Sequence, residues 1–226
     1  TRYWRDWSSD VCSSDLEALS AQVAAVLDDF AVGAIKTGML LNRPLIEATA
    51  AALTGVALPT LIDPVMVSRA GSPLLDPDAV EAYRRLLFPL AELITPNLHE
   101  AALLTGMAVD SEAAVERAAE QLLQLGPGAV LIKGGGQVPW CGHDYLLERS
   151  GAGLWLGHSA VQTPHTHGSG CTLGAAITAQ RALGRPLVQA VQGAKTYVEG
   201  GLRQSLAIGA GQGPLCHWHP WSETDG

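Results

Sequence analysis

Two glycines flank Ser169 in the segment HGSGCTLGAAITAQ, and residues of these types can build a site for an anion. Glycine lets the backbone turn so that several N–H groups point towards one place. The residues from Gly170 onward predict a helix, whose N-terminus attracts negative charge. Gly168, Ser169, Gly170 and Cys171 therefore suit the charge on a transferring phosphoryl group. The alternative is a glycine turn that only begins a helix, since neither GxxxxGKS/T nor GxGxxG occurs in the chain.

Cys171 also has two interpretations. A thiol at the start of a helix ionises more readily than a free one, so Cys171 could take the proton from a substrate hydroxyl. Most free cysteines are instead small, buried, apolar residues, and the residues taken alone favour that interpretation.

Lysines and carboxylates stand at other places where strands are predicted to end. Lys133 precedes three glycines and could reach phosphate oxygens, although an exposed lysine before a flexible loop has the same pattern. Asp63, before a proline, is either a turn residue or a carboxylate near a metal ion. Asn97 and Glu100 have the spacing of a helix-capping box, which is the structural alternative to Glu100 organising metal-bound water. Lys195 falls in the last predicted helix, where a solvated lysine is expected.

An alternation of strands and helices must position these residues. Apolar runs and helical spacing predict one α/β domain with a mostly parallel sheet. Ligands of such sheets bind beyond the carboxyl ends of the strands, and five of these ends carry Gly, Pro, Asp, Asn or Lys. The predicted strands are 31–40, 59–62, 92–95, 129–133, 141–148 and 154–163. The predicted helices are 18–29, 45–53, 76–87, 97–104, 111–125, 170–183 and 186–206.

The composition excludes several classes of protein. The 226 residues are 47% hydrophobic and 16% charged, which suits a folded globular chain rather than a disordered one. Apolar runs are broken before the roughly 18 residues that a membrane helix needs. A net charge of −8 without a basic stripe argues against a nucleic-acid partner. The four cysteines form no CxxC pair, so we expect reduced thiols in a cytoplasmic protein.

The first stretch, TRYWRDWSSDVCSSDL, differs from the rest of the chain. It contains the near-repeat SSDVCSSD and shows neither helical nor strand periodicity. It also lacks the apolar core of a signal peptide. We expect residues 1–16 to be non-native or disordered and residues 17–226 to form the domain.

Six segments in order make the chain similar to one family. They are AIKTGML, DPVMVSRAGSPLL, LITPNLHEAALLTG, VLIKGGG, HGSGCTLGAAI and GQGPLCHWH. This order resembles the bacterial hydroxymethylpyrimidine/phosphomethylpyrimidine kinases of thiamine synthesis, which belong to the ribokinase superfamily. The resemblance implies a three-layer α/β/α sandwich that uses ATP and Mg²⁺. It also implies phosphorylation of 4-amino-5-hydroxymethyl-2-methylpyrimidine and then of its monophosphate.

The resemblance assigns roles around the phosphoryl group. Residues 168–171 match the family's anion hole, and Cys171 stands where most sugar kinases of the superfamily have an aspartate base. A cysteine there is typical of the pyrimidine kinases and of their pyridoxal-phosphorylating relatives. Lys133, Lys195 and Thr166 become candidate nucleotide-binding residues.

Metal and substrate residues follow from the same resemblance. Asp63 and Glu100 match the acidic residues that position Mg²⁺ and its waters. Met39 and Val65 match residues that line the pyrimidine pocket. The family implies small-molecule partners and a homodimer, with no membrane partner.

One departure from the family pattern is large. Family members begin with a strand and a glycine-rich loop of the type GSDSSGGAG, which has no counterpart here. We therefore expect a kinase domain that lacks its first strand region. Ser169, where threonine is usual, is a smaller departure. The alternatives are a pyridoxal or pyridoxine kinase of the same superfamily, or an inactive fragment that only binds nucleotide.

Overall fold

The computed structural model describes residues 13–66, 75, 77–135, 140–157 and 159–221. Their strands form a six-stranded sheet in the order β1-β2-β3-β4-β5-β6. Strands β1 to β4 are parallel to one another, whereas β5 is antiparallel to both of its neighbours, β4 and β6. The predicted mostly parallel α/β sheet is thus confirmed. The strands are β1 Ile35–Thr37, β2 Thr60–Ile62, β3 Leu93–Ile94, β4 Ala129–Lys133, β5 His143–Glu148 and β6 Leu154–Gly157.

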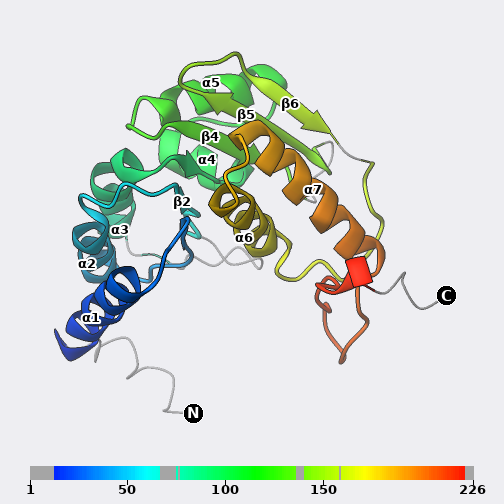
Figure 1. Cartoon of the computed structure of the whole chain (residues 1–226). Helices are drawn as coiled ribbons and strands as arrows, with labels where there is room; N and C mark the ends of the chain where they lie inside the picture. Colours follow the sequence, from blue (N-terminus) through cyan, green and yellow to red (C-terminus); the bar gives the residue numbers. More distant parts are fainter. Residues whose placement is uncertain (1–12, 67–74, 76, 136–139, 158, 222–226) are drawn as a thin grey trace, which may run out of the picture.

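Helices cover both faces of this sheet, which makes three layers (Figure 1). Successive strand residues point to opposite faces, so Leu61 and Ile62 enter different cores. Ile62 packs with α2, α3, α4 and α5, and Leu61 packs with α6 and α7. The helices are α2 Arg43–Leu53, α3 Pro77–Ala82, α4 Leu98–Thr105, α5 Glu112–Leu123, α6 Ser169–Ala182 and α7 Leu187–Arg203.

Side-chain caps explain where several helices begin. The Asn42 side chain accepts a hydrogen bond from the Leu45 N–H at 3.1 Å at the start of α2. Ser111 caps α5 in the same way, through the Ala114 N–H at 3.3 Å. A side-chain acceptor at this position satisfies one of the N–H groups that a helix start leaves without a backbone partner.

Helix boundaries differ most from the prediction at two places. Helix α1 spans Ser13–Asp29 and so includes the last four residues of the segment expected to be disordered or non-native; residues 1–12 lie outside the described part. The helix predicted over 76–87 changes at Tyr83 into a π-helical turn that ends at Leu87. Pro89 follows and lacks the N–H that would continue an α-helix.

The predicted strand 154–163 is too long. Strand β6 ends at Gly157, which pairs with His143, the first residue of β5. Residues beyond Gly157 therefore have no neighbouring strand to pair with, and Ser159–Thr163 line a cavity instead. Among the described residues, no helix is long and apolar enough to cross a membrane.

Candidate active site

Asp63 is the centre of an ion-pair network at the carboxyl edge of the sheet. Its side chain is 2% exposed, and its Oδ1 lies 2.9 Å from the Lys133 Nζ at the end of β4. The same oxygen accepts a hydrogen bond from the Thr95 hydroxyl at 3.0 Å, and Oδ2 lies 3.8 Å from the Lys36 Nζ. Residues in or directly after the first four strands thus meet at one carboxylate, as expected for a ligand site in a parallel sheet.

Lys133 is a buried cation, not the exposed lysine of the structural alternative. Burial by itself lowers the pKa of this amine, but the negative charges of Asp63 and Glu100 outweigh it and raise the pKa above 10.5. Lys133 therefore carries its charge throughout the physiological pH range.

Glu100 forms the predicted capping box and also contacts the segment after β2. Its N–H donates to the Asn97 side chain at 2.9 Å, and its Oε2 accepts from the Asn97 N–H at 2.8 Å. Its Oε1 accepts from the Met66 N–H at 3.3 Å. Burial raises the pKa of this carboxyl above 4.5, although the charge of Lys133 opposes the shift. Glu100 thus caps α4, and its contact with Met66 connects α4 to the segment that follows Asp63.

The raised pKa of Glu100 gives a testable pH dependence. The folded chain holds this proton more tightly than the unfolded chain, so the linkage stabilises the fold below pH 4.5 and is lost as pH rises through the raised pKa. Relative to Glu100→Gln, the wild-type free energy of unfolding should therefore fall as the pH rises above about 4.5. Urea unfolding at several pH values measures this difference.

The matched control for that experiment is Glu112→Gln, at an exposed position in the first turn of α5. A flat profile for Glu100→Gln, or one that matches the profile of Glu112→Gln, would contradict the prediction.

The anion-hole segment forms the first turn of α6. Gly168 precedes it with φ 80°, a left-handed conformation that a side chain would strain. The first residue of α6 to form the regular helix bond is Thr172, whose N–H donates to the Gly168 carbonyl at 2.8 Å. The Ser169 N–H turns back to the Thr166 carbonyl at 3.3 Å, so the geometry offers the N–H groups of Gly170 and Cys171 to an anion. The glycine turn therefore does more than begin a helix, because its N–H groups are placed to bind a phosphate.

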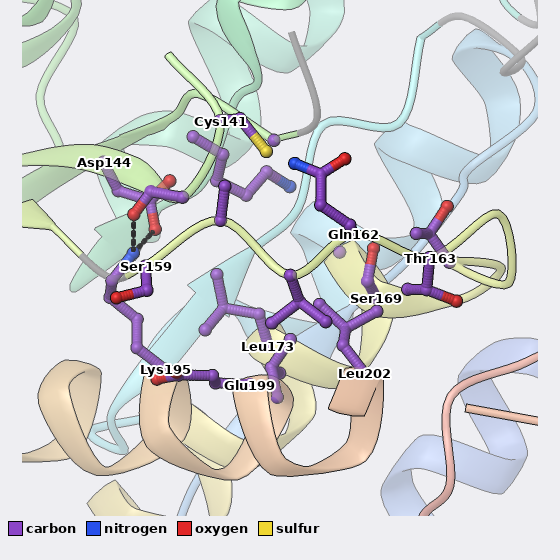
Figure 2. A pocket seen from close by; sticks show the side chains of 18 of the residues that line it. Cys141, Asp144, Ser159, Gln162, Thr163, Ser169, Leu173, Lys195, Glu199 and Leu202 are labelled. Atoms are coloured by element: carbon purple, nitrogen blue, oxygen red, sulfur yellow. Dashed lines mark hydrogen bonds and ion pairs between the residues drawn. The ribbon is translucent and has the colours of Figure 1, made fainter. Parts of the chain in front are cut away.

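A cavity of about 450 Å³ opens beside this helix start (Figure 2). Its volume lies within the usual range for small-molecule sites. It is lined by the end of β4, the start of α6, one side of α7 and residues of the segment 159–166, together with Gly135, Cys141, Gly142, Asp144 of β5, and Gln212. Five of the predicted site residues line it: Lys133, Lys195, Thr166, Ser169 and Gly170.

Lys195 is buried, contrary to the expectation of a solvated lysine. Its Nζ forms an ion pair with Asp144 Oδ2 and donates to the Gly142 carbonyl at 3.3 Å (Figure 2). Asp144 also accepts the Gly134 N–H at 3.0 Å through Oδ1. This aspartate therefore connects α7 to the glycines after Lys133.

Asp144 is a site residue that the sequence pattern did not single out. The available signal was a carboxylate inside a predicted strand, because a charge is rarely buried in a sheet without a partner. Its partner Lys195 lies 51 residues away in the chain, and only the fold brings the two together.

Other predicted residues lie outside the cavity lining. Cys171 is exposed, which excludes the small buried interpretation of this thiol. Met39, with 51% exposure, and the half-buried Val65 follow β1 and β2 along the same edge. Asp63, the partner of Lys133, and Glu100 do not line the cavity either. The structure thus places the three nucleotide candidates, Ser169 and Gly170 at one cavity, and the two substrate candidates outside its lining.

The fold and this site together define a ribokinase-like phosphotransferase. The Bacillus subtilis pyridoxal kinase, solved as an ADP complex, superimposes with a TM-score of 0.83 at 33% identity, covering 92% of this chain and 78% of that one. The Clostridium difficile phosphomethylpyrimidine kinase gives 0.71 at 32% identity, covering 81% and 75%. The predicted three-layer kinase fold is therefore confirmed.

Sequence relatives narrow the class further. The hydroxymethylpyrimidine/phosphomethylpyrimidine kinase of Synechococcus elongatus is 49% identical over 203 residues, which are 89% of this chain and 77% of the relative. The corresponding kinase of Haemophilus influenzae is 41% identical over 214 residues, 92% and 79% of the two chains. The phosphomethylpyrimidine kinase family model matches residues 5–216. The chain belongs to the phosphomethylpyrimidine kinase family.

Proposed function

We propose that the protein transfers the γ-phosphoryl group of ATP to 4-amino-5-hydroxymethyl-2-methylpyrimidine and then to its monophosphate, in thiamine biosynthesis. The observation that carries this proposal is the meeting of Lys133, Asp63 and the α6 N-terminus beside one cavity, in a chain of this family. Positive groups converge there on the place where a transferring phosphoryl group would carry its charge.

In this proposal the cavity holds ATP. Lys133 neutralises charge on the phosphates. Thr166, in the loop before α6, also lines the cavity. Lys195 acts through its ion pair with Asp144, which keeps α7 and the residue after Lys133 in place. The Bacillus subtilis relative was solved with ADP, which supports a nucleotide in this class of kinase.

Cys171 is the proposed base. Its exposed thiolate takes the proton of the substrate hydroxyl, and the hydroxyl oxygen forms a bond to the γ-phosphorus. The bond from that phosphorus to the bridging oxygen of ATP breaks, and ADP leaves with the electron pair. The N–H groups of Gly170 and Cys171 face the equatorial oxygens, and Cys171 returns its proton to solvent afterwards.

Mg²⁺ fits this site only as a companion of ATP. The described residues contain no group of three or more His, Cys, Asp or Glu that could hold a metal ion. Mg²⁺ in kinases is usually bound by one or two carboxylates together with substrate phosphates and water, and Asp63 and Glu100 could supply that contribution. When bound, the ion would neutralise charge on the phosphates.

Met39 and Val65 are the proposed contacts of the pyrimidine ring. Both follow strand ends next to the Asp63 network, on the edge from which the first turn of α6 also begins. The proposal also includes a homodimer in the cytoplasm, and size-exclusion chromatography with light scattering tests the dimer.

A second candidate, pyridoxal phosphorylation, rests on one specific observation. The Bacillus subtilis pyridoxal kinase superimposes better than the Clostridium difficile phosphomethylpyrimidine kinase, with TM-scores of 0.83 and 0.71. Fold similarity alone does not fix the substrate, because one fold can serve several chemistries.

One competition experiment decides between these candidates. The purified chain is incubated with Mg·ATP and either the hydroxymethylpyrimidine, its monophosphate or pyridoxal, and the products are separated by chromatography. We expect the highest kcat/KM for the two pyrimidines. A higher value for pyridoxal would select the second candidate, and ADP binding without turnover of any substrate would select the fragment that only binds nucleotide.

A further inference from the structure

The chain has only three lysines, Lys36, Lys133 and Lys195, and all of them lie at or beside the site. Each forms an ion pair with a buried aspartate: Lys36 and Lys133 with Asp63, and Lys195 with Asp144. The exposed ion pairs of the described residues use arginine instead. Lys36 is the lysine for which the proposed function has no role.

Lys36 connects the sheet to the first turn of α6. It lies in the middle of β1, and its Nζ donates to the Cys171 carbonyl at 3.1 Å across 135 residues of sequence. The same Nζ lies 3.8 Å from Asp63 Oδ2, and the side chain is 19% exposed. One amine therefore contacts both the anion-hole turn and the central carboxylate.

A glycine in α6 makes room for this lysine. A Cβ added at Gly174 would lie 2.8 Å from the Lys36 Cε and 3.4 Å from its Nζ. Gly174 lies in the interior of α6, where alanine would favour the helix more than glycine does. At the point where Lys36 passes, the helix thus contains a residue that stabilises helical structure less than alanine would.

Lys36 places a positive charge beside the N-terminal turn of α6, where a cation is usually unfavourable. Cations are favourable near helix C-termini and unfavourable near N-termini, where the dipole is positive. Lys133 lies on the other side of the same turn, with its Nζ 3.7 Å from a Cβ built at Gly170. Asp63 is paired with both amines, so the turn has two cations and one anion beside its positive end. A bound phosphoryl group would balance this excess of positive charge.

We propose that Lys36 is a positioning residue for phosphoryl transfer. It holds the Cys171 carbonyl, and with it the N–H groups of the first turn, at a fixed distance from the Asp63–Lys133 pair. This inference rests on the proposed function for its catalytic consequence, although the contact with the α6 turn is independent of it.

Three variants test this role. Lys36→Met removes the charge at similar length, Lys36→Arg keeps the charge, and Gly174→Ala displaces the lysine without replacing it. In steady-state assays with the preferred substrate, Lys36→Met should lower kcat roughly 10- to 100-fold, as loss of a supporting contact does elsewhere. The KM for ATP should change less than about threefold, because Lys36 does not line the cavity. Gly174→Ala should lower kcat by less, and Lys36→Arg should restore part of it.

The matched control is Arg43→Met, which removes an exposed cation of α2 that is paired with Glu47. It should leave kcat unchanged. An unchanged kcat in Lys36→Met would overturn the proposal. Equal losses in Lys36→Met and Lys36→Arg, with a matching rise in the KM for ATP, would also overturn it, because they would indicate general damage to the fold.

Amide hydrogen exchange gives a readout that needs no turnover. In Lys36→Met, exchange should accelerate at Thr172, whose N–H is bonded to the Gly168 carbonyl, while the rest of α6 stays protected. At Gly170 and Cys171, ADP should slow exchange less than it does in the wild type. Acceleration along the whole helix, or none at Thr172, would overturn the positioning role. Absence of turnover in the wild type would contradict the proposed function alone, and the exchange data would still decide the role of Lys36.

Discussion

Replacement of Cys171 by alanine is expected to lower kcat by roughly 10²- to 10⁴-fold, the usual contribution of a positioned general base. The exposed thiol stands at the third residue of α6, next to the N–H groups offered to the phosphoryl group. The KM for ATP should stay within about threefold of the wild type, because Cys171 does not line the cavity. Initial rates over a range of ATP concentrations separate these two constants.

Cys216→Ala is the matched control for that variant. Cys216 is 3% exposed and packs through its backbone against Gly201 of α7, away from the cavity lining. Its kcat should equal that of the wild type, with at most a lower melting temperature. Unchanged turnover in Cys171→Ala would remove the thiol from the mechanism and leave the backbone N–H groups as the contribution of this turn.

Replacement of Asp63 by asparagine is expected to have the largest effect on stability. The amide leaves Lys133 buried without its partner carboxylate, and Lys36 loses the same charge. Removal of one member of a buried ion pair typically costs about 3–5 kcal/mol, because the remaining charge stays in a poorly solvating environment. Urea unfolding of wild type and Asp63→Asn measures the loss of unfolding free energy.

A double variant separates the buried charge from general damage to the fold. Asp63→Asn with Lys133→Met removes both charges, so it should be more stable than Asp63→Asn alone, while kinase activity stays low. Glu47→Gln breaks an exposed pair of α2 and should change the free energy of unfolding by no more than about 1 kcal/mol. A loss in Asp63→Asn no larger than that control would contradict the prediction.

The local signals in the sequence were sufficient for most of the architecture. Asn97 and Glu100 predicted a capping box, and Pro64 and the glycines after Lys133 marked the ends of strands. The apolar run Ala129–Lys133 predicted a buried strand, which is buried at all five positions. Such features depend on neighbours within a few residues, which a single sequence contains in full.

Long-range pairings could not be predicted in the same way. Lys195 looked solvated because its helix alone does not reveal that Asp144 lies beneath it. Lys36 stands within the segment AIKTGML, but its contact with the Cys171 carbonyl depends on how α6 docks on the sheet. The length of β6 likewise depends on where β5 begins. These features follow from tertiary packing, which overrides local patterns.

The strand order of the sheet has a consequence for how the site forms during folding. Because strands β1 to β6 are neighbours in their order along the chain, each new strand can add to the edge of the previous one as synthesis proceeds. Helices α6 and α7 come last, and until they dock, the sheet face with Leu61, Leu93 and Leu131 stays uncovered. The anion-hole turn therefore joins an existing sheet in the final step, and refolding should restore sheet structure before it restores nucleotide binding.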